Sequence, residues 1–307
     1  MSLALSTSWN AFRAKSASDM LFEIQGLGFN EIELSFSLTA EMCAGVKKSI
    51  KASGLKVRSL HNYCPIPEGL TIEEALPDCF SMSSLDENER GSAVKHTLKT
   101  IETAADFQAQ AVVLHCGRVE IADKTRDLIR LYEGGRNDFP EFKELRELII
   151  RERKTSLGRH LDQTLKSLDT LNAAAKKRGV LLGVETRYYF REIPSLQEIC
   201  LILKEFKGSQ IGYWHDAGHA EVMERLGFYR HLEILELYKD SMLGIHLHDL
   251  TGCHDHKAPG QGDLDFTKIK PYLSRDCLKI MEAHHPAATE DIKNGKVLLE
   301  RVFDGLI

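Results

Sequence analysis

The chain has 307 residues, of which 43% are hydrophobic and 28% charged, a composition typical of a globular enzyme with a large core. A formal net charge of −5 argues against a protein that coats nucleic acid. No stretch approaches the roughly 20 apolar residues that span a bilayer, and the N-terminal segment lacks the regions of a signal peptide. The seven cysteines include no C-x-x-C pair, so we expect a cytoplasmic protein with reduced thiols and no membrane partner.

Eight short apolar runs recur along the chain, each rich in aliphatic or β-branched residues. This pattern is typical of parallel strands that are buried on both faces. The runs are residues 3–8, 31–36, 56–61, 111–117, 180–186, 211–216, 243–249 and 278–284.

Amphipathic segments lie between the runs, and several of them end at glycine, as helices commonly do. They are residues 18–25, 40–53, 89–108, 161–177, 196–206, 231–238, 266–273 and 297–303. A strand followed by a helix, repeated eight times, predicts a closed (β/α)8 TIM barrel. An open doubly wound sheet is the alternative, but it rarely uses eight such regular units. Because no linker, repeat or low-complexity tract divides the chain, we treat residues 1–307 as a single domain.

Two predicted connections are much longer than the usual link in such a barrel. Residues 64–88 follow the third predicted strand, and residues 118–155 follow the fourth. Long insertions after barrel strands often build lids or substrate pockets, so we expect residues 118–155 to form a lid. Contact with another subunit of a homo-oligomer is the alternative role.

Imidazole and carboxylate side chains gather at the C-terminal ends of six consecutive predicted strands, which all open onto one face of a barrel. Only three of the thirteen histidines, His96, His160 and His231, fall clearly within predicted helices. The residues at or just after the strand ends are His61, His115, Glu185, Asp216, His219, His246, His248, Asp249, Glu282, His284 and His285. Nitrogen and oxygen ligands on one face predict a site for a divalent ion such as Zn, Mn, Co, Fe or Mg.

Some of these residues also have a purely structural interpretation. Glu185 and Glu282 follow apolar residues, and a buried carboxylate needs a partner, which is either a metal ion or, for Glu185, the nearby Arg187. Asp216 is suited to capping the next helix. His248 points to the same side of its strand as His246, so it either supports a ligand or contacts substrate.

The order Glu, Asp, His, Glu on the last four predicted strands resembles the xylose-isomerase-like TIM barrels. That family includes sugar isomerases, epimerases and an apurinic-site endonuclease branch. Further marks are Asp216-Ala-Gly-His219 and the run HLHD followed by HKAPGQG, and the resemblance covers essentially the whole chain. It implies that one metal ion is held by Glu185, Asp216, His246 and Glu282, with Glu33 at a position where the family often has a strand-two glutamate.

The resemblance implies a divalent-metal-dependent isomerase or epimerase of a sugar, sugar phosphate or polyol-derived keto compound. Glu185 and Glu282 would be the catalytic pair, passing a proton through an enediolate beside one ion of Zn, Mn, Co or Mg. His219 would bind a substrate hydroxyl. Trp9 either lines the pocket or belongs to the core, and Arg187 and Lys257 are candidates to bind a substrate phosphate or carboxylate.

The endonuclease branch binds up to three metal ions, which gives the alternative function of a multinuclear-metal phosphodiesterase. Its extra ligands fall here on His61, His115, His219, His254 and His256. The position of His254 is an aspartate in that branch. In the isomerase branch, His61 and His115 contact substrate or fill the top of the barrel. We expect a small carbohydrate-like partner rather than nucleic acid, and the number of bound ions distinguishes the two functions.

Overall fold

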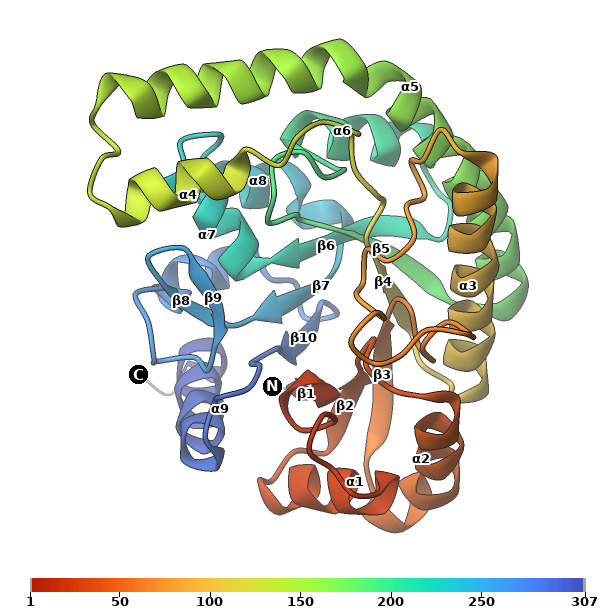
Figure 1. Ribbon diagram of the computed structural model, residues 1–307. Helices are drawn as coiled ribbons and strands as arrows, with labels where there is room; N and C mark the ends of the chain where they lie inside the picture. Colours follow the sequence, from red (N-terminus) through yellow and green to blue (C-terminus); the bar gives the residue numbers. More distant parts are fainter. Residues whose placement is uncertain (1, 306–307) are drawn as a thin grey trace.

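Eight parallel strands close into a barrel in the computed structural model, which describes residues 2–305 (Figure 1). Their order around the barrel is β1-β10-β7-β6-β5-β4-β3-β2. The strands are β1 (Ala4–Ser6), β2 (Glu31–Leu34), β3 (Lys56–His61), β4 (Ala111–Leu114), β5 (Leu181–Glu185), β6 (Ile211–Asp216), β7 (Met242–Leu247) and β10 (Leu278–Met281). Each overlaps one predicted run, so the predicted (β/α)8 barrel is confirmed.

Helices surround the barrel (Figure 1). They are α1 (Ala17–Gly26), α2 (Ala40–Ser53), α3 (Glu87–Asp106), α4 (Thr125–Glu133), α5 (Pro140–Arg178), α6 (Leu196–Glu205), α7 (Ala217–Arg225), α8 (His231–Tyr238) and α9 (Thr289–Asp304). Local signals set their ends: the Thr39 side chain accepts a hydrogen bond from the backbone of Met42 at the start of α2, and left-handed Gly54 terminates it. None of the helices between residues 2 and 305 is both long and apolar enough to cross a membrane.

The helix predictions need four corrections. Residues 266–273 form two short 3-10 turns, Phe266–Lys268 and Lys270–Tyr272, because Pro271 cannot supply the backbone N–H that a continuous α-helix requires. Helix α9 begins eight residues before the predicted position, and α7 was not predicted. The predicted helix 161–177 is only the second half of α5, which continues without a break from Pro140.

The indole of Trp214 fills the barrel interior beneath the strand ends. It is fully buried and packs with five other buried strand residues, among them Val113 and Ile280. Gly183 and Gly244 make room for it, because a Cβ at either position would overlap the indole ring. Trp214 contacts the imidazole of His246 edge to face, at 5.2 Å between ring centres, and so forms the floor of the region above.

The two long connections adopt different forms. Residues 62–86, after β3, are irregular and run along the barrel mouth. The second connection forms an arm, which we define as α4 together with the first half of α5, and which extends beyond the barrel at the upper left of Figure 1. Phe142 and Ile149 of the arm pack with Met223 of α7 and Cys253 in an apolar cluster outside the main core.

An antiparallel hairpin follows β7 at the barrel mouth. It consists of β8 (Asp249–Thr251) and β9 (His254–Lys257), where the sequence predicted only a loop. The Asp249 carboxylate holds its base by accepting hydrogen bonds from the backbone N–H groups of Leu250, Gly260 and Leu264, each at 2.9 Å. The hairpin therefore has a fixed position above the ends of β7 and β10.

Candidate metal centre

Four strand ends bring Glu185, Asp216, His246 and Glu282 together, and all four side chains are buried. Nδ1 of His246 lies 2.6 Å from Oε1 of Glu185, 2.9 Å from Oε2 of Glu282 and 3.7 Å from Oδ2 of Asp216. One ligand atom from each residue lies within 4.8 Å of the other three. Three carboxylates around one imidazole nitrogen form a site in which all four groups can bind the same cation.

The opposite nitrogen of His246 has a partner of its own, outside the group of four ligands. Nε2 lies 3.2 Å from Oε2 of Glu33, which also accepts a hydrogen bond from the Ser59 hydroxyl at 2.7 Å. Because a carboxylate can only accept, Glu33 keeps a proton on Nε2, and a bound cation would displace only the proton on Nδ1. A carboxylate behind a ligating histidine is the usual arrangement in metal centres, so the donor set fits a divalent ion.

The electrostatics also favour a cation. Burial alone would raise the pKa of Glu185, but hydrogen bonds from His115, His246 and His61 hold it well below its usual range. Burial would likewise raise the pKa values of Asp216 and Glu282, and their histidine neighbours keep both well below normal. Burial alone would lower the pKa of His246, yet Glu282 and Glu33 raise it well above its usual value. Such a dense group of buried carboxylates requires compensating positive charge, which a metal ion supplies.

The second oxygen of Glu185 faces another pair of histidines. Oε2 lies 2.8 Å from Nε2 of His115 and 3.7 Å from Nε2 of His61. His61 donates through Nδ1 to the carbonyl of Asn62 at 2.9 Å, so its Nε2 is free to bind a ligand. His61, His115 and Glu185 thus form a second group with the geometry for a cation.

Arg187 lies inside the protein, where its charge is compensated by acidic side chains. Its guanidinium contacts Glu185 at 3.1 Å, Asp78 at 3.0 Å and Glu192 at 3.3 Å. Asp78 also accepts from Nδ1 of His115 at 3.0 Å, and although burial opposes it, His115 and Arg187 lower the pKa of Asp78. Arg187 therefore positions Glu185, and Asp78 and Glu192 are site residues that the sequence did not indicate.

A third group of candidate ligands lies between β6 and the hairpin and consists of Asp216, His219, His248 and His256. His219 donates through Nδ1 to the carbonyl of Thr186 at 3.0 Å and directs Nε2 toward Oδ2 of Asp255, 3.4 Å away. Burial alone would lower the pKa of His219, but Asp216 and Asp255 raise it to about 10. His256 belongs to the same group, and burial lowers its pKa to about 4.

His248 supports Asp216. Its Nε2 lies 2.9 and 3.0 Å from the two carboxylate oxygens of Asp216, and its Nδ1 accepts from the backbone N–H of His256 at 2.9 Å. Both ring nitrogens are therefore engaged within the protein. This arrangement agrees with the supporting role expected for His248 and holds Asp216 in one orientation.

His254 is exposed and belongs to none of the ligand groups, contrary to expectation. Because side chains alternate between the two faces of a strand, residues 254 and 256 of a regular β9 would point to the same face. His256 has a φ of 54°, in the left-handed region, which breaks that alternation and lets both Asp255 and His256 face the site. Asp255 consequently takes the position that the sequence assigned to His254.

Two expected substrate contacts also lie elsewhere. Trp9 belongs to the core, where its indole N–H donates to the carbonyl of Ala287 at 2.9 Å. Lys257 donates to the Thr251 hydroxyl at 3.0 Å and borders a neighbouring cavity rather than the metal ligands.

A cavity of about 320 Å³ opens above the ligand groups. Its walls include Pro77 and Asp78 from the connection after β3, and Tyr188, Tyr189 and Glu192 from the loop after β5. No described residue between 118 and 155 lines it. The expectation that residues 118–155 form a lid is therefore not supported, because the arm packs to one side on α7 and the hairpin.

The chain matches the family model of the xylose isomerase-like TIM barrels over residues 22–293. It belongs to this family. Two solved relatives share the fold along nearly the whole chain: the 3-keto-D-glucoside 4-epimerase YcjR of E. coli (17% identity, TM-score 0.70, 98% of this chain and 99% of that one) and an L-ribulose 3-epimerase (15%, 0.69, 99% and 94%).

A curated relative, the uncharacterized protein y4fM of Sinorhizobium fredii, is 24% identical over 230 residues. The match covers 73% of this chain and 64% of that protein, so it spans less than two thirds of the relative's length.

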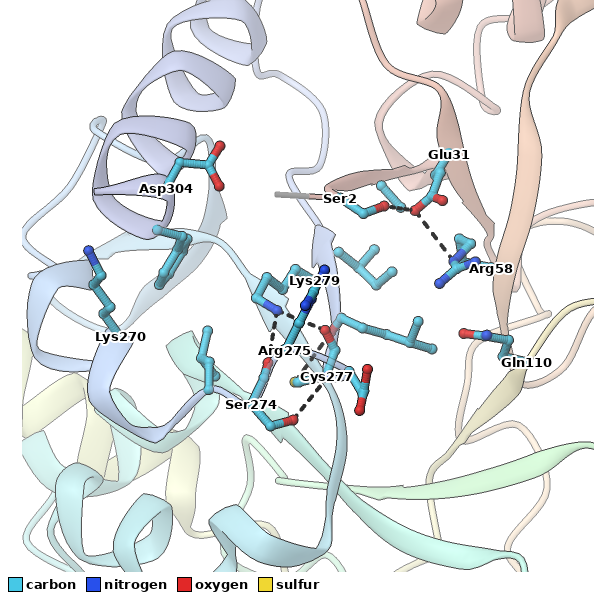
Figure 2. Close-up of a pocket in the computed structure, with 16 residues that line it drawn as sticks. Ser2, Glu31, Arg58, Gln110, Lys270, Ser274, Arg275, Cys277, Lys279 and Asp304 are labelled. Atoms are coloured by element: carbon cyan, nitrogen blue, oxygen red, sulfur yellow. Dashed lines mark hydrogen bonds and ion pairs between the residues drawn. The ribbon is translucent and has the colours of Figure 1, made fainter. Parts of the chain in front are cut away.

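A larger cavity, of about 810 Å³, lies at the opposite end of the barrel, where the strands begin (Figure 2). Several of its charged groups are already engaged: Arg58 pairs with Glu31 at 3.4 Å, and Lys279 donates to the carbonyls of Ser274 and Cys277. None of the candidate ligand residues described above lines it. Active sites in TIM barrels lie at the C-terminal ends of the strands, so we place the chemistry at the smaller cavity.

Side chains from three elements hold the turn of the β8–β9 hairpin. Glu133 of α4 accepts from the backbone N–H of Cys253 at 2.5 Å, Arg225 of α7 donates to the carbonyl of Gly252 at 2.5 Å, and Tyr188 donates to the carbonyl of Cys253 at 2.6 Å. Gly252 has a φ of 57°, and a Cβ there would overlap the Glu133 carboxylate. The arm therefore supports the hairpin that carries Asp255 and His256.

Proposed function

We propose that the protein is a divalent-metal-dependent epimerase or isomerase of a keto sugar or a related hydroxy-carbonyl compound. The observation that carries the proposal is the convergence of Glu185, Asp216 and Glu282 on Nδ1 of His246 beside an open cavity. Two of these carboxylates, Glu185 and Glu282, line that cavity and so lie where a substrate would bind. Membership in the family and the sugar epimerases among its solved relatives support the same class of chemistry.

The ligand set of three carboxylates and one imidazole suits Zn, Mn, Co or Mg. When bound, such an ion polarises the substrate carbonyl and so eases removal of a proton from the adjacent carbon. Glu33 and His248 keep the His246 and Asp216 side chains oriented toward the centre.

Glu185 and Glu282 carry the proton in this proposal. One removes it from the carbon next to the carbonyl, and the other returns a proton to the opposite face for epimerisation, or to the adjacent carbon for isomerisation. Glu185 is held by Arg187 and His115, whereas the ion-pair partners of Glu282 among residues 2–305 are all histidines. We therefore assign proton removal to Glu282. His219, with Nε2 facing the cavity, is placed to bind a substrate hydroxyl.

A multinuclear phosphodiesterase is the second candidate, and a specific observation favours it. Glu185 is shared between the groups around His246 and around His61, and Asp216 is shared with the group of His219 and His256. Shared carboxylates can bridge neighbouring ions, so the geometry would accommodate up to three. The named activities of the two solved relatives are both sugar epimerisation, and we therefore rank the hydrolase second.

One experiment separates the two candidates. The purified protein is analysed for bound metal, then incubated in D2O with Mn²⁺, Co²⁺, Mg²⁺ or Zn²⁺ and a panel of ketoses and 3-keto-glucosides. We expect one tightly bound ion per chain and deuterium at the carbon next to the carbonyl, detected by NMR. Glu282→Gln should slow this exchange about 100- to 10,000-fold, as loss of a general base does.

The control is Glu290→Gln on the exposed surface of α9, which should exchange at the wild-type rate. Unchanged exchange in Glu282→Gln would reject its role. Two or three tight ions together with hydrolysis of bis-p-nitrophenyl phosphate, and no deuterium exchange, would replace the epimerase with the hydrolase.

A further inference from the structure

A second cavity, of about 500 Å³, lies directly beside the metal cavity. Asp255, His256 and His284 line both, so these three residues form the boundary between them. The remaining walls come from β9, the segment after β10 and the start of α9. A substrate that reaches over this boundary would occupy both cavities.

The boundary is a stack of flat rings with one unpaired polar atom. The ring of His256 stacks on His248 at 4.3 Å and 9°, and on His284 at 3.9 Å and 15°. Nε2 of His284 is buried without a hydrogen-bond partner, and the nearest carboxylate oxygen, of Glu282, is 3.8 Å away. A buried donor or acceptor without a partner costs free energy, which a polar group passing between the cavities would recover.

The charges of the second cavity do not suit an anion. Lys257 is the only lysine or arginine among its described lining residues, where two carboxylates, Asp255 and Asp291, lie with four histidines. The N-terminus of α9, where a phosphate would bind best, is taken by Asp291, whose Oδ2 accepts from the backbone N–H of Ala288 at 3.0 Å. Neutral hydroxyl groups, which both donate and accept, match such a lining better than a phosphate or carboxylate does.

We infer that the substrate is a glycoside with two units, in which a keto sugar reacts at the metal centre and a second, neutral sugar unit occupies the cavity beyond His284. This inference rests on the proposed epimerase or isomerase function and specifies its substrate class. It predicts that a sugar phosphate is not the preferred substrate, because Asp255 and Asp291 line the cavity beside the reacting ring and Asp291 occupies the N-terminus of α9. The two cavities have the separate volumes that two linked rings need.

The test compares three probes in the deuterium-exchange assay: methyl 3-keto-glucoside, the 3-keto derivative of a glucosyl disaccharide, and 3-keto-glucose 6-phosphate. We expect kcat/KM to be at least about tenfold higher for the disaccharide derivative than for the other two, since a second unit adds binding contacts. Gln261→Trp, at an exposed residue of the second cavity, fills that cavity. It should raise KM about tenfold for the disaccharide derivative and leave kcat/KM for the methyl glycoside within about twofold.

The matched control is Gln25→Trp, at an exposed position on α1, which should change neither substrate's kinetics. Preference for the phosphate, or a Gln261→Trp effect that is absent or equal for both neutral substrates, would overturn the inference while leaving the epimerase function intact. Absence of exchange with every probe and ketose would instead reject the proposed function, and this inference with it.

Discussion

The two long insertions at the barrel mouth act on the candidate site in different ways. The irregular connection after β3 places Asp78 directly in the metal cavity, where it contacts His115 and Arg187. The arm formed by α4 and the first half of α5 contributes no described residue to that cavity. Its contact with the site is indirect, through Glu133 and the hairpin turn.

The comparison shows that the length of an insertion does not determine whether it covers a site. The connection after β3 has little secondary structure, and its position depends on core residues such as Cys64 and Met82 and on the contacts of Asp78. The arm has its own helices and an apolar cluster with α7, so it is stable in a position beside the pocket. An irregular insertion can thus supply a site residue, and a longer helical insertion can support the hairpin that carries other site residues.

The largest difference between the two insertions should appear on removing Asp78. Asp78→Ala leaves Nδ1 of His115 without its partner and removes one of three carboxylates around Arg187. We expect exchange activity to fall about 10- to 100-fold, as is typical on losing a residue that orients metal ligands, with only a small change in the melting temperature. Glu73→Ala, exposed in the same connection, is the control. A loss of less than twofold would place this connection with the arm as a structural support.

An intermediate effect is expected from Gly252→Ala in the hairpin turn. The added methyl group disfavours the positive φ by about 1–2 kcal/mol and also overlaps the Glu133 carboxylate. The hairpin should shift, so thermal unfolding and KM should both change. Gly69→Ala separates the two causes, because Gly69 has a φ of 91° with open space around it. Equal loss of stability and unchanged KM in both variants would show that the arm does not position the hairpin.

The smallest effect is expected from Glu133→Gln. The amide oxygen can still accept from the backbone of Cys253, but a hydrogen bond to a neutral group is weaker than one to a carboxylate. We expect the free energy of unfolding to fall by about 1 kcal/mol and kcat to change less than about threefold. Denaturant unfolding and the exchange assay measure the two quantities. A tenfold fall in kcat with unchanged stability would mean that the arm has a direct catalytic role.

The barrel and the residues around His246 follow from features that the sequence displays. Apolar runs define the strands, and polar residues at their ends must meet at one face. Asp78 was not predicted because it lies in an irregular connection, where no periodicity relates sequence position to direction. Asp255 was missed because its orientation depends on the φ of His256, which residue spacing does not reveal. The position of the arm depends on packing against α7, a helix that the sequence did not indicate.

The indole of Trp214 closes the barrel interior below His246. Its buried indole fills the interior between Gly183 and Gly244 and so separates His246 from the 810 Å³ cavity at the far end. Ion, substrate and product must therefore enter and leave at the end of the barrel where the 320 Å³ and 500 Å³ cavities lie. A bound substrate then stands in the exit route of the ion, so the metal should leave most slowly during turnover and most quickly from the resting enzyme.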